Sequence, residues 1–407
     1  MDQIHSCGLT ASRFPTTAFL RALWCLTLAA VAVGWLQADM IRQSWPRSQQ
    51  YSLAAGLVVG FLVSVLQQHP RRRMCWVPVG ALGLAAGLVL WLAAGLTWSV
   101  AALVGVSAGA LLTAQRATGL DAGSAVDGPT RPSWRGSFLP AFALASGWGA
   151  GVLRWEGVIS GEAPVACLAA LSAGTFIVSL WVYRRPCFEQ LLELLIWPMY
   201  RVRAAGPGVA AFPPAGPVLV IANHAAYLDP FWVMKVLPRE LTPMMISRYF
   251  DLPVAHWLMT HVVRAIRVEW SFYRHDAPEL EEAVARLDCG EGVLIFPEGW
   301  VRRTEEVPVR RFGQGVWRIL RERPATPVVA CWIDGGWGSL ASYWNGPPFR
   351  NKRMDWWRPI GVGVAAPVVL DTATLADQHA TRERLRGMCV DARRYLGLAA
   401  IDQGEGT

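Results

Sequence analysis

The sequence predicts an all-α membrane bundle of six spans, followed by an α/β domain whose mixed sheet is flanked by helices. Charged residues make up only 17% of the chain and hydrophobic residues 53%, whereas soluble domains carry about 25% charged residues. The apolar residues gather between Thr17 and Tyr183. Beyond Arg184, short β-branched runs alternate with helical patterns, as they do in α/β domains. We therefore expect a transmembrane domain over residues 1–185, the α/β domain over 186–370, and a C-terminal helix and tail over 371–407.

Six apolar stretches are long enough, or nearly long enough, to cross a bilayer as helices. They are Thr17–Leu36, Tyr51–Gln67, Cys75–Ala94, Trp98–Ala114, Phe138–Val158 and Ala163–Tyr183. Small residues in the second and fourth stretches favour close helix packing in lipid. We interpret the first stretch as an uncleaved anchor rather than a cleaved signal peptide, because it is long and further spans follow it.

Arginines are unevenly distributed over the loops between these stretches. They concentrate before the first stretch and after the second, fourth and sixth: Arg13, Arg71, Arg72, Arg73, Arg116, Arg131, Arg135, Arg184 and Arg185. Six spans put all these loops on one side, so the positive-inside rule predicts that both termini are cytoplasmic. We therefore expect a multi-pass protein of the inner or cell membrane, with the α/β domain on its cytoplasmic side.

The charge balance and the cysteines restrict the partners further. The net charge of +8 fits a surface that meets anionic lipid head groups. We expect no nucleic-acid partner, because the chain has no recognition motif and no basic repeat. The eight cysteines are scattered, without a Cys-x-x-Cys pair or a Cys/His cluster, so we also expect no metal site.

The second half of the chain contains a regular series of strand and helix patterns. Short buried strands are predicted at Val218–Ala222, Gly292–Phe296, Pro327–Ile333 and Ile360–Val369, and a helix at Pro278–Arg286. Two other segments suggest contact with a membrane surface. Phe188–Tyr200 is rich in apolar residues and follows the last span, which is typical of an interfacial segment. Phe349–Arg358 mixes cations with aromatic residues, and is either a surface resting on anionic lipid or an exposed loop with its tryptophans packed inward.

The clearest chemistry lies in the run Asn223–Pro230. His224 has Asp229 five positions later, and no other histidine of the chain has a carboxylate at that spacing. An imidazole held by a carboxylate is a general base that can take a proton from a hydroxyl. Five residues turn a helix by about 500°, so the two side chains meet only across a turn or a helix start.

A second motif, Phe296–Gly299, adds Glu298. Both His224 and Glu298 come directly after predicted buried strands. Open α/β sheets place their sites at the carboxyl ends of strands, so we expect the two side chains to share one site.

These two motifs together resemble the glycerolipid acyltransferase family, which includes the 1-acyl-glycerol-3-phosphate acyltransferases. The resemblance covers roughly Tyr200–Val369. Three later runs are similar to motifs of that family: Arg302-Arg303-Thr304, Phe312–Gly315 and Thr326–Val329. Asp334–Ser339 resembles a variant found where the domain is fused to a transporter-like membrane half. The membrane half itself weakly resembles half of a major-facilitator transporter.

The resemblance implies acyl transfer from acyl-CoA or acyl-acyl-carrier protein to the hydroxyl of a lysophospholipid or 1-acyl-glycerol-3-phosphate. His224 and Asp229 would be the catalytic pair, and the substrate hydroxyl would be the nucleophile, so no cofactor is expected. The substrate-binding residues would be Glu298, Gly299, Arg302, Arg303 and Arg267. The family's second motif usually ends in an arginine. Trp270 stands there in this chain, and Arg267 and Arg274 are the nearest replacements. An oxyanion contact is also required, for which the backbone amides after Asn223 or near Gly299 are candidates.

Three functions remain open on the sequence. The first is a lysophospholipid or lysophosphatidate acyltransferase. The second is a lipid transporter or flippase whose acyltransferase-like domain is regulatory or inactive. The third is an acyltransferase for another acceptor, such as a lipid A precursor or an amino-acid lipid. The complete set of His224, Asp229 and Glu298 favours the enzymes over the transporter. The sequence does not separate the acceptors, nor does it give the oligomeric state.

Overall fold

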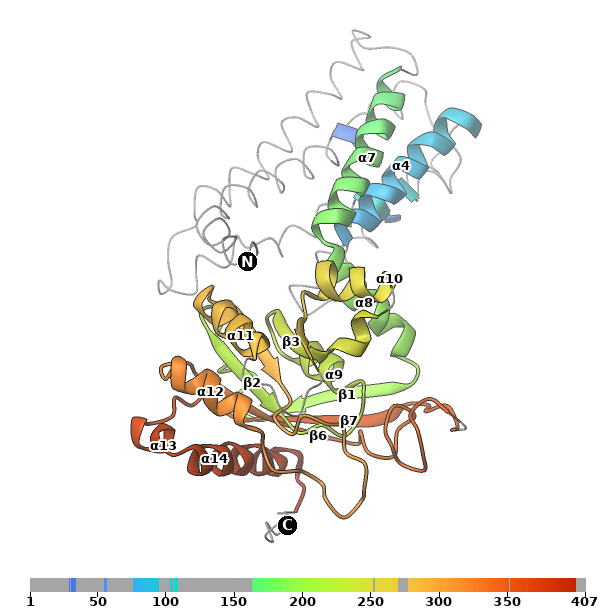
Figure 1. The fold of residues 1–407 in the computed structure, drawn as a ribbon. Coiled ribbons are helices and arrows are strands. Elements are labelled where there is room, and N and C mark those ends of the chain that lie inside the picture. The colour runs from blue at the N-terminus through green and yellow to red at the C-terminus, as the bar shows by residue number, and fades with distance from the viewer. Residues whose placement is uncertain are drawn as a thin grey trace. The chain divides into compact units, whose positions relative to one another are not determined.

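The computed structural model describes residues 76–94, 163–251, 253–269, 277–350 and 352–399, together with short helical pieces at 29, 31–33, 55–56, 103–104 and 106–108. The chain divides into two compact units, and the boundary between them along the sequence falls between Gln190 and Leu191. We describe each unit by itself (Figure 1).

Two long apolar helices make up most of what is described in the first unit. They are α4 (Trp76–Ala94) and α7 (Ala163–Val182), which coincide with the third and sixth predicted spans. They pack through one cluster that includes Leu84, Leu88 and Leu168. Within the described residues, α7 alone is long and apolar enough to cross a membrane, and the apolar part of α4 is shorter.

The other four predicted spans fall almost entirely outside the described residues. Six spans, the cytoplasmic placement of the α/β unit and the likeness to a transporter half therefore stay predictions. Trp270 and Arg274 also lie outside the described residues.

The second unit is an α/β domain built on a seven-stranded sheet in the order β1-β7-β6-β2-β5-β3-β4. The strands are β1 (Tyr200–Ala205), β2 (Val218–Ala222), β3 (Leu241–Ile246), β4 (Ile266–Val268), β5 (Gly292–Ile295), β6 (Val328–Asp334) and β7 (Arg358–Val364). All neighbouring pairs are parallel except β6 with β7. The predicted mixed sheet is thus confirmed. Each predicted strand coincides with an observed one to within a few residues, whereas β1, β3 and β4 were not predicted.

Helices lie on both faces of this sheet (Figure 1): α9 (Asp229–Val236) on one, and α11 (Pro278–Asp288), α12 (Gln314–Glu322) and α14 (Gln378–Asp391) on the other. The remaining elements are α8 (Arg184–Ile196), which crosses the boundary between the two units, α10 (Pro253–Trp257), α13 (Thr372–Ala376), η3 (Ser247–Phe250), η4 (Leu258–Val263) and η5 (Ala392–Leu396). The helix predicted at Pro278–Arg286 is α11, which runs two residues further.

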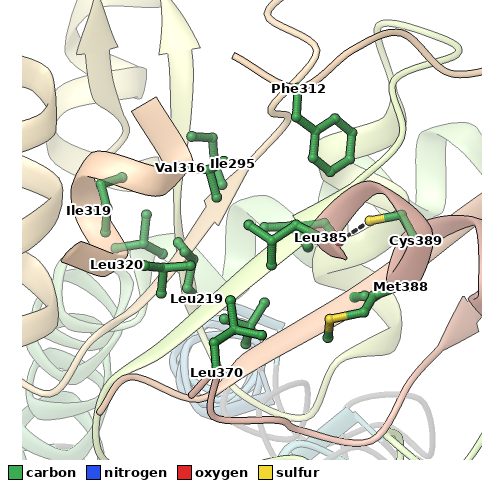
Figure 2. Close-up of a cluster of buried hydrophobic side chains, with 14 of the residues drawn as sticks. Leu219, Ile295, Phe312, Val316, Ile319, Leu320, Leu370, Leu385, Met388 and Cys389 are labelled. Carbon is green, nitrogen blue, oxygen red and sulfur yellow. Dashed lines mark hydrogen bonds between the residues drawn. The ribbon is translucent and has the colours of Figure 1, made fainter. Parts of the chain in front are cut away.

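Strand β2 is buried on both faces, which explains why it reads as a continuous apolar run. Its Leu219 and Ile221 belong to a core shared with α11, α12 and α14. Figure 2 shows Leu219 in this core, together with Leu385 and Cys389 of α14. The alternate residues Val218 and Val220 belong to a second core, on the face that α9 covers. Burial on both sides fixes β2 at the centre of the domain, and with it the residues that follow its carboxyl end.

Candidate active site

Asn223 fixes the chain where it leaves β2. Its side chain is buried, its Nδ2 donates to the carbonyl of Ile333 at 3.1 Å, and its Oδ1 accepts from the amide of Ile333 at 2.6 Å. Ile333 belongs to the neighbouring strand β6. The side-chain amide of Asn223 therefore extends the hydrogen-bonded ladder between β2 and β6 by one residue. It also holds the start of the next turn in place.

His224 and Asp229 meet across the turn that follows, as the sequence predicted. Asp229 is the first residue of α9, so a helix start lies between the two side chains. His224 Nδ1 lies 2.9 Å from Asp229 Oδ2. A carboxylate oxygen accepts, so Nδ1 carries the proton and Nε2 keeps its lone pair. The histidine side chain is 16% exposed and the aspartate side chain 0%. The imidazole is thus a base that a substrate can reach, with a buried acid behind it.

The environment of Asp229 balances two opposing effects. Burial raises the pKa of its carboxyl above the usual value, while the hydrogen bonds from His224, Ala226 and Ala225 lower it. The two backbone amides donate to the same oxygen that His224 contacts, at 2.6 Å from Ala225 and 2.8 Å from Ala226. Three donors on one oxygen, at the start of a helix, favour the ionised form. The carboxylate therefore orients the imidazole and stabilises the imidazolium that forms when His224 takes a proton.

Glu298 follows β5 and lies in the same site, but its contacts differ from those expected of a substrate-binding residue. Its Oε1 accepts from the backbone amide of His224 at 2.8 Å, and its Oε2 from the amide of Arg310 at 2.9 Å. Burial raises the pKa of Glu298 to about 7, although both hydrogen bonds lower it. The carboxyl group thus joins the His224 turn to the chain near Arg310. The predicted role of Glu298 in substrate binding stays a prediction.

We expect Glu298→Gln to destabilise the protein in a way that depends on pH. An amide supplies one acceptor and one donor, so its NH₂ would face a backbone N–H; at pH 5 the expected cost is about 1–3 kcal/mol. The pKa of Glu298 rises from 4.5 in the unfolded chain to about 7 in the folded protein. The wild-type carboxyl therefore stabilises the fold fully below about pH 4.5. This contribution, on the order of 3 kcal/mol, is lost as the pH rises through 7.

The difference in the free energy of unfolding between the wild type and Glu298→Gln should therefore become smaller between pH 5 and pH 8. Thermal unfolding of the full-length chain in detergent measures it, with Glu322→Gln at an exposed position as the matched control. A gap that stays constant or widens over this range would contradict the assignment.

The residues after Glu298 hold His224 from a further side. Gly299 adopts a φ of 71°, a left-handed conformation that favours glycine, and this turn brings Arg302 back to the site. The amide of Arg302 donates to the carbonyl of His224 at 2.7 Å. The Arg302 guanidinium donates to the carbonyls of Thr304 and Glu305 and lies 4.4 Å from the Trp337 ring. The backbone and side chain of Arg302 thus both make contacts within the protein.

The other two predicted arginines lie in different surroundings. Arg303 lies over the Trp300 ring at 5.4 Å and over the Tyr343 ring at 5.0 Å. The Tyr343 hydroxyl lies 3.1 Å from that of Tyr227, inside the His224 turn. Arg267 is on the edge strand β4, where it pairs with Glu269 at 2.7 Å. The contacts of Arg303 therefore link it to the His224 turn, whereas Arg267 contacts Glu269 beyond its own strand and the Phe250 ring of η3, 5.8 Å away.

Several backbone amides that are candidates for an oxyanion hole already donate to acceptors within the protein. Those of Ala225 and Ala226 donate to Asp229, and that of His224 donates to Glu298. The amide of Gly299 donates to the carbonyl of Phe296 at 3.0 Å. Because these four amides already have acceptors inside the protein, they are poorly placed to donate to a substrate oxygen. An oxyanion contact from another amide near Gly299 stays a prediction.

Sequence reasoning missed two supporting residues. Phe296 stacks on the His224 ring with centroids 4.3 Å apart. Gly336 faces Asp229 closely: a Cβ there would lie 3.3 Å from Asp229 Oδ1 and 3.1 Å from the Trp232 ring. The Phe-Pro-Glu-Gly and Asp-Gly-Gly-Trp patterns both drew attention to these positions, but only the fold shows which side chains they meet.

Comparison with known proteins agrees with this geometry. Residues 207–334, which carry the whole His224 and Glu298 arrangement, match the family described as Acyltransferase. This segment is an acyltransferase-family domain. It is similar over 190 residues to N-acylphosphatidylethanolamine synthase of Arabidopsis thaliana, with 26% identity. That match covers 42% of this chain and 65% of the relative, so the chain spans just under two thirds of the relative's length.

Among solved structures, the crystal structure of the 1-acyl-sn-glycerophosphate acyltransferase PlsC from Thermotoga maritima matches with a TM-score of 0.40 and 14% identity. The match covers 62% of this chain and 90% of that one.

Proposed function

We propose that this protein transfers a fatty acyl group from acyl-CoA or acyl-acyl-carrier protein to the hydroxyl of a lysophospholipid or 1-acyl-glycerol-3-phosphate. The observation that carries the proposal is the pair of His224 and Asp229, 2.9 Å apart, with the imidazole partly exposed and the carboxylate buried. Nε2 takes the proton of the acceptor hydroxyl, and the oxygen attacks the thioester carbonyl. The C–S bond then breaks, and the thiolate leaves with the proton that His224 returns. The hydroxyl is itself the nucleophile, so we propose no further cofactor and no metal.

A second candidate acceptor is an amine. The chain is similar to a protein named N-acylphosphatidylethanolamine synthase, a name that describes acylation of a lipid amine. The same base can take a proton from an attacking amine, so the His224 geometry is compatible with both acceptors. We place the hydroxyl first because the motifs at His224 and Glu298 resemble the family of glycerolipid acyltransferases.

The membrane half supports a location for the reaction. We propose an integral, multi-pass protein whose acyltransferase domain works at the cytoplasmic surface of the inner or cell membrane on membrane lipids. In support, α7 is apolar and long enough to span a bilayer. A transporter with an inactive domain is the weaker candidate, because each member of the His224, Asp229 and Glu298 set has a specific contact in the structure.

An acceptor panel tests the proposal. Purified full-length protein is incubated with labelled acyl-CoA or acyl-acyl-carrier protein and with lysophosphatidate, other lysophospholipids or phosphatidylethanolamine. Mild alkali then releases acyl groups bound as esters and leaves amides intact, which separates hydroxyl from amine acceptors. Labelled ester product that disappears in His224→Ala supports the proposal, and labelled amide favours the second candidate. Inactivity with every donor and acceptor would overturn both.

Arg303 is expected to select acceptors that carry an anionic head group. It is exposed and lies over the ring of Tyr343, whose hydroxyl meets that of Tyr227 in the His224 turn. Since a guanidinium suits phosphate oxygens, Arg303→Gln should raise KM for lysophosphatidate about tenfold, with kcat nearly unchanged. Arg311→Gln, at another exposed position, is the control. An equal loss of kcat in Arg303→Gln would show that this arginine acts on the chemistry rather than on binding.

A further inference from the structure

A large exposed apolar surface covers the end of α8 and the loop that joins β6 to β7. It consists of Leu194 (67% exposed), Leu195 (64%), Trp197 (54%), Phe349 (57%), Trp356 (66%) and Trp357 (41%); we call this set the aromatic surface. Soluble proteins seldom expose a contiguous patch of large apolar side chains unless it binds something. The surface therefore requires an occupant.

Its two parts are joined by direct contacts. The rings of Trp197 and Trp357 meet edge to face with centroids 4.8 Å apart. The amide of Trp357 donates to the carbonyl of Pro198 at 2.9 Å, and the amide of Arg358 donates to that of Met199 at 2.8 Å. The end of α8 and the loop thus form one continuous surface, although they are far apart in the sequence.

Internal contacts hold the loop while its aromatic side chains are exposed. Phe349 and Trp357 adopt φ values of 62° and 53°, in the left-handed region that bulky residues seldom occupy. Asp355 holds the loop from inside, accepting from the Tyr200 hydroxyl at 2.8 Å and from the amide of Leu340 at 2.7 Å. Asp355 therefore ties this part of the loop to β1 and to Leu340.

The charges around the aromatic surface indicate its occupant. Arg350 and Arg353 are exposed on the loop of the aromatic surface, and the exposed Arg201 of β1 lies 4.7 Å from the Trp357 ring. Tryptophan with arginine is the combination found at membrane interfaces, and cations close to an anionic bilayer strengthen its binding. A second copy of the same surface would instead bring like charges together.

We propose that the aromatic surface rests in the head-group region of an anionic lipid bilayer. Chain continuity supports this occupant, because α8 begins at Arg184, directly after the apolar helix α7 ends at Val182. The loop also starts beside the site: Ala226 pairs with Ser342, and the amide of Tyr227 donates to the carbonyl of Ala341 at 3.0 Å. Docking of the aromatic surface therefore holds the His224 turn next to the lipid.

Photo-crosslinking tests the proposal without using acyl transfer, so its result is independent of the proposed reaction. The full-length chain is placed in vesicles of phosphatidylcholine and phosphatidylglycerol that contain labelled lipid. The photoreactive amino acid p-benzoylphenylalanine replaces Trp356 or Phe349, and in the control it replaces Arg384, an exposed residue of α14. Lipid adducts at both aromatic positions and none at the control are expected. Adducts to a second copy of the chain, equal adducts at the control, or no lipid adduct at the two aromatic positions would overturn the proposal.

Charge reversal tests the preference for anionic lipid. The Arg350→Glu/Arg353→Glu variant should lower the lipid adduct at position 356 about threefold or more in vesicles that contain phosphatidylglycerol. It should have little effect in pure phosphatidylcholine. The matched control, Arg384→Glu/Arg394→Glu, reverses two charges on exposed residues outside the aromatic surface. An equal loss of adduct in the control, or no loss in the test variant, would overturn the role of the cations.

Discussion

Replacing His224 by alanine is expected to lower kcat for acyl transfer by about 10²–10⁴, the usual contribution of a general base. The substitution removes the only group of the pair that a substrate can reach, since Asp229 is fully buried. The backbone contacts of position 224 with Glu298 and Arg302 do not depend on the imidazole. The variant should therefore fold and insert as the wild type does. Single-turnover assays with labelled acyl donor measure the loss.

His379→Ala is the matched control, because His379 is an exposed histidine on α14. It should retain full activity. The assignment of His224 as the base would be wrong if the folded His224→Ala variant kept the wild-type rate. Circular dichroism and thermal unfolding of the same preparations separate loss of fold from loss of chemistry.

The part of the site that the sequence predicted depends on local pattern. His224 and Asp229 are separated by five residues, and a helix start was the one local geometry that let them meet. The structure shows this start at Asp229. Val218–Ala222 was recognised as a strand because burial on both faces makes every residue apolar, and its predicted bounds equal those of β2.

The parts that the sequence did not predict depend on contacts between distant segments or on weak strands. β3 contains Pro243, which argues against a strand, and β4 has only three residues. Glu298 was placed correctly at the end of β5, yet its contact with the amide of Arg310 follows from the path of the intervening loop. Residue type and spacing carry no information about such a path.

The structure also explains how a single histidine is positioned. Asp229 holds its ring through Nδ1, and Phe296 packs against the face of that ring. Glu298 accepts from its amide, and the amide of Arg302 donates to its carbonyl. The contacts come from the segment that follows β5 and from the start of α9. A base held in this way needs little reorganisation when it takes a proton, and this is the property that favours catalysis.

Asp229→Asn is expected to lower kcat by about 10²–10⁴ while it leaves the fold nearly unchanged. Asp229 Oδ2 accepts all three hydrogen bonds, whereas Oδ1 is buried without a hydrogen-bond partner in the described structure. An asparagine can keep its oxygen at the Oδ2 position and place its NH₂ at the Oδ1 position, so the turn retains its donors. What it loses is the negative charge that stabilises the imidazolium of His224. The substitution therefore tests the contribution of the negative charge while the hydrogen bonds are kept.

The matched control is Asp377→Asn, which removes a charge at the start of α14, where asparagine caps a helix as well as aspartate does. Both variants should unfold at nearly the wild-type temperature, and the site variant alone should lose activity. A site variant that kept the wild-type rate would show that Asp229 supports the turn but not the reaction.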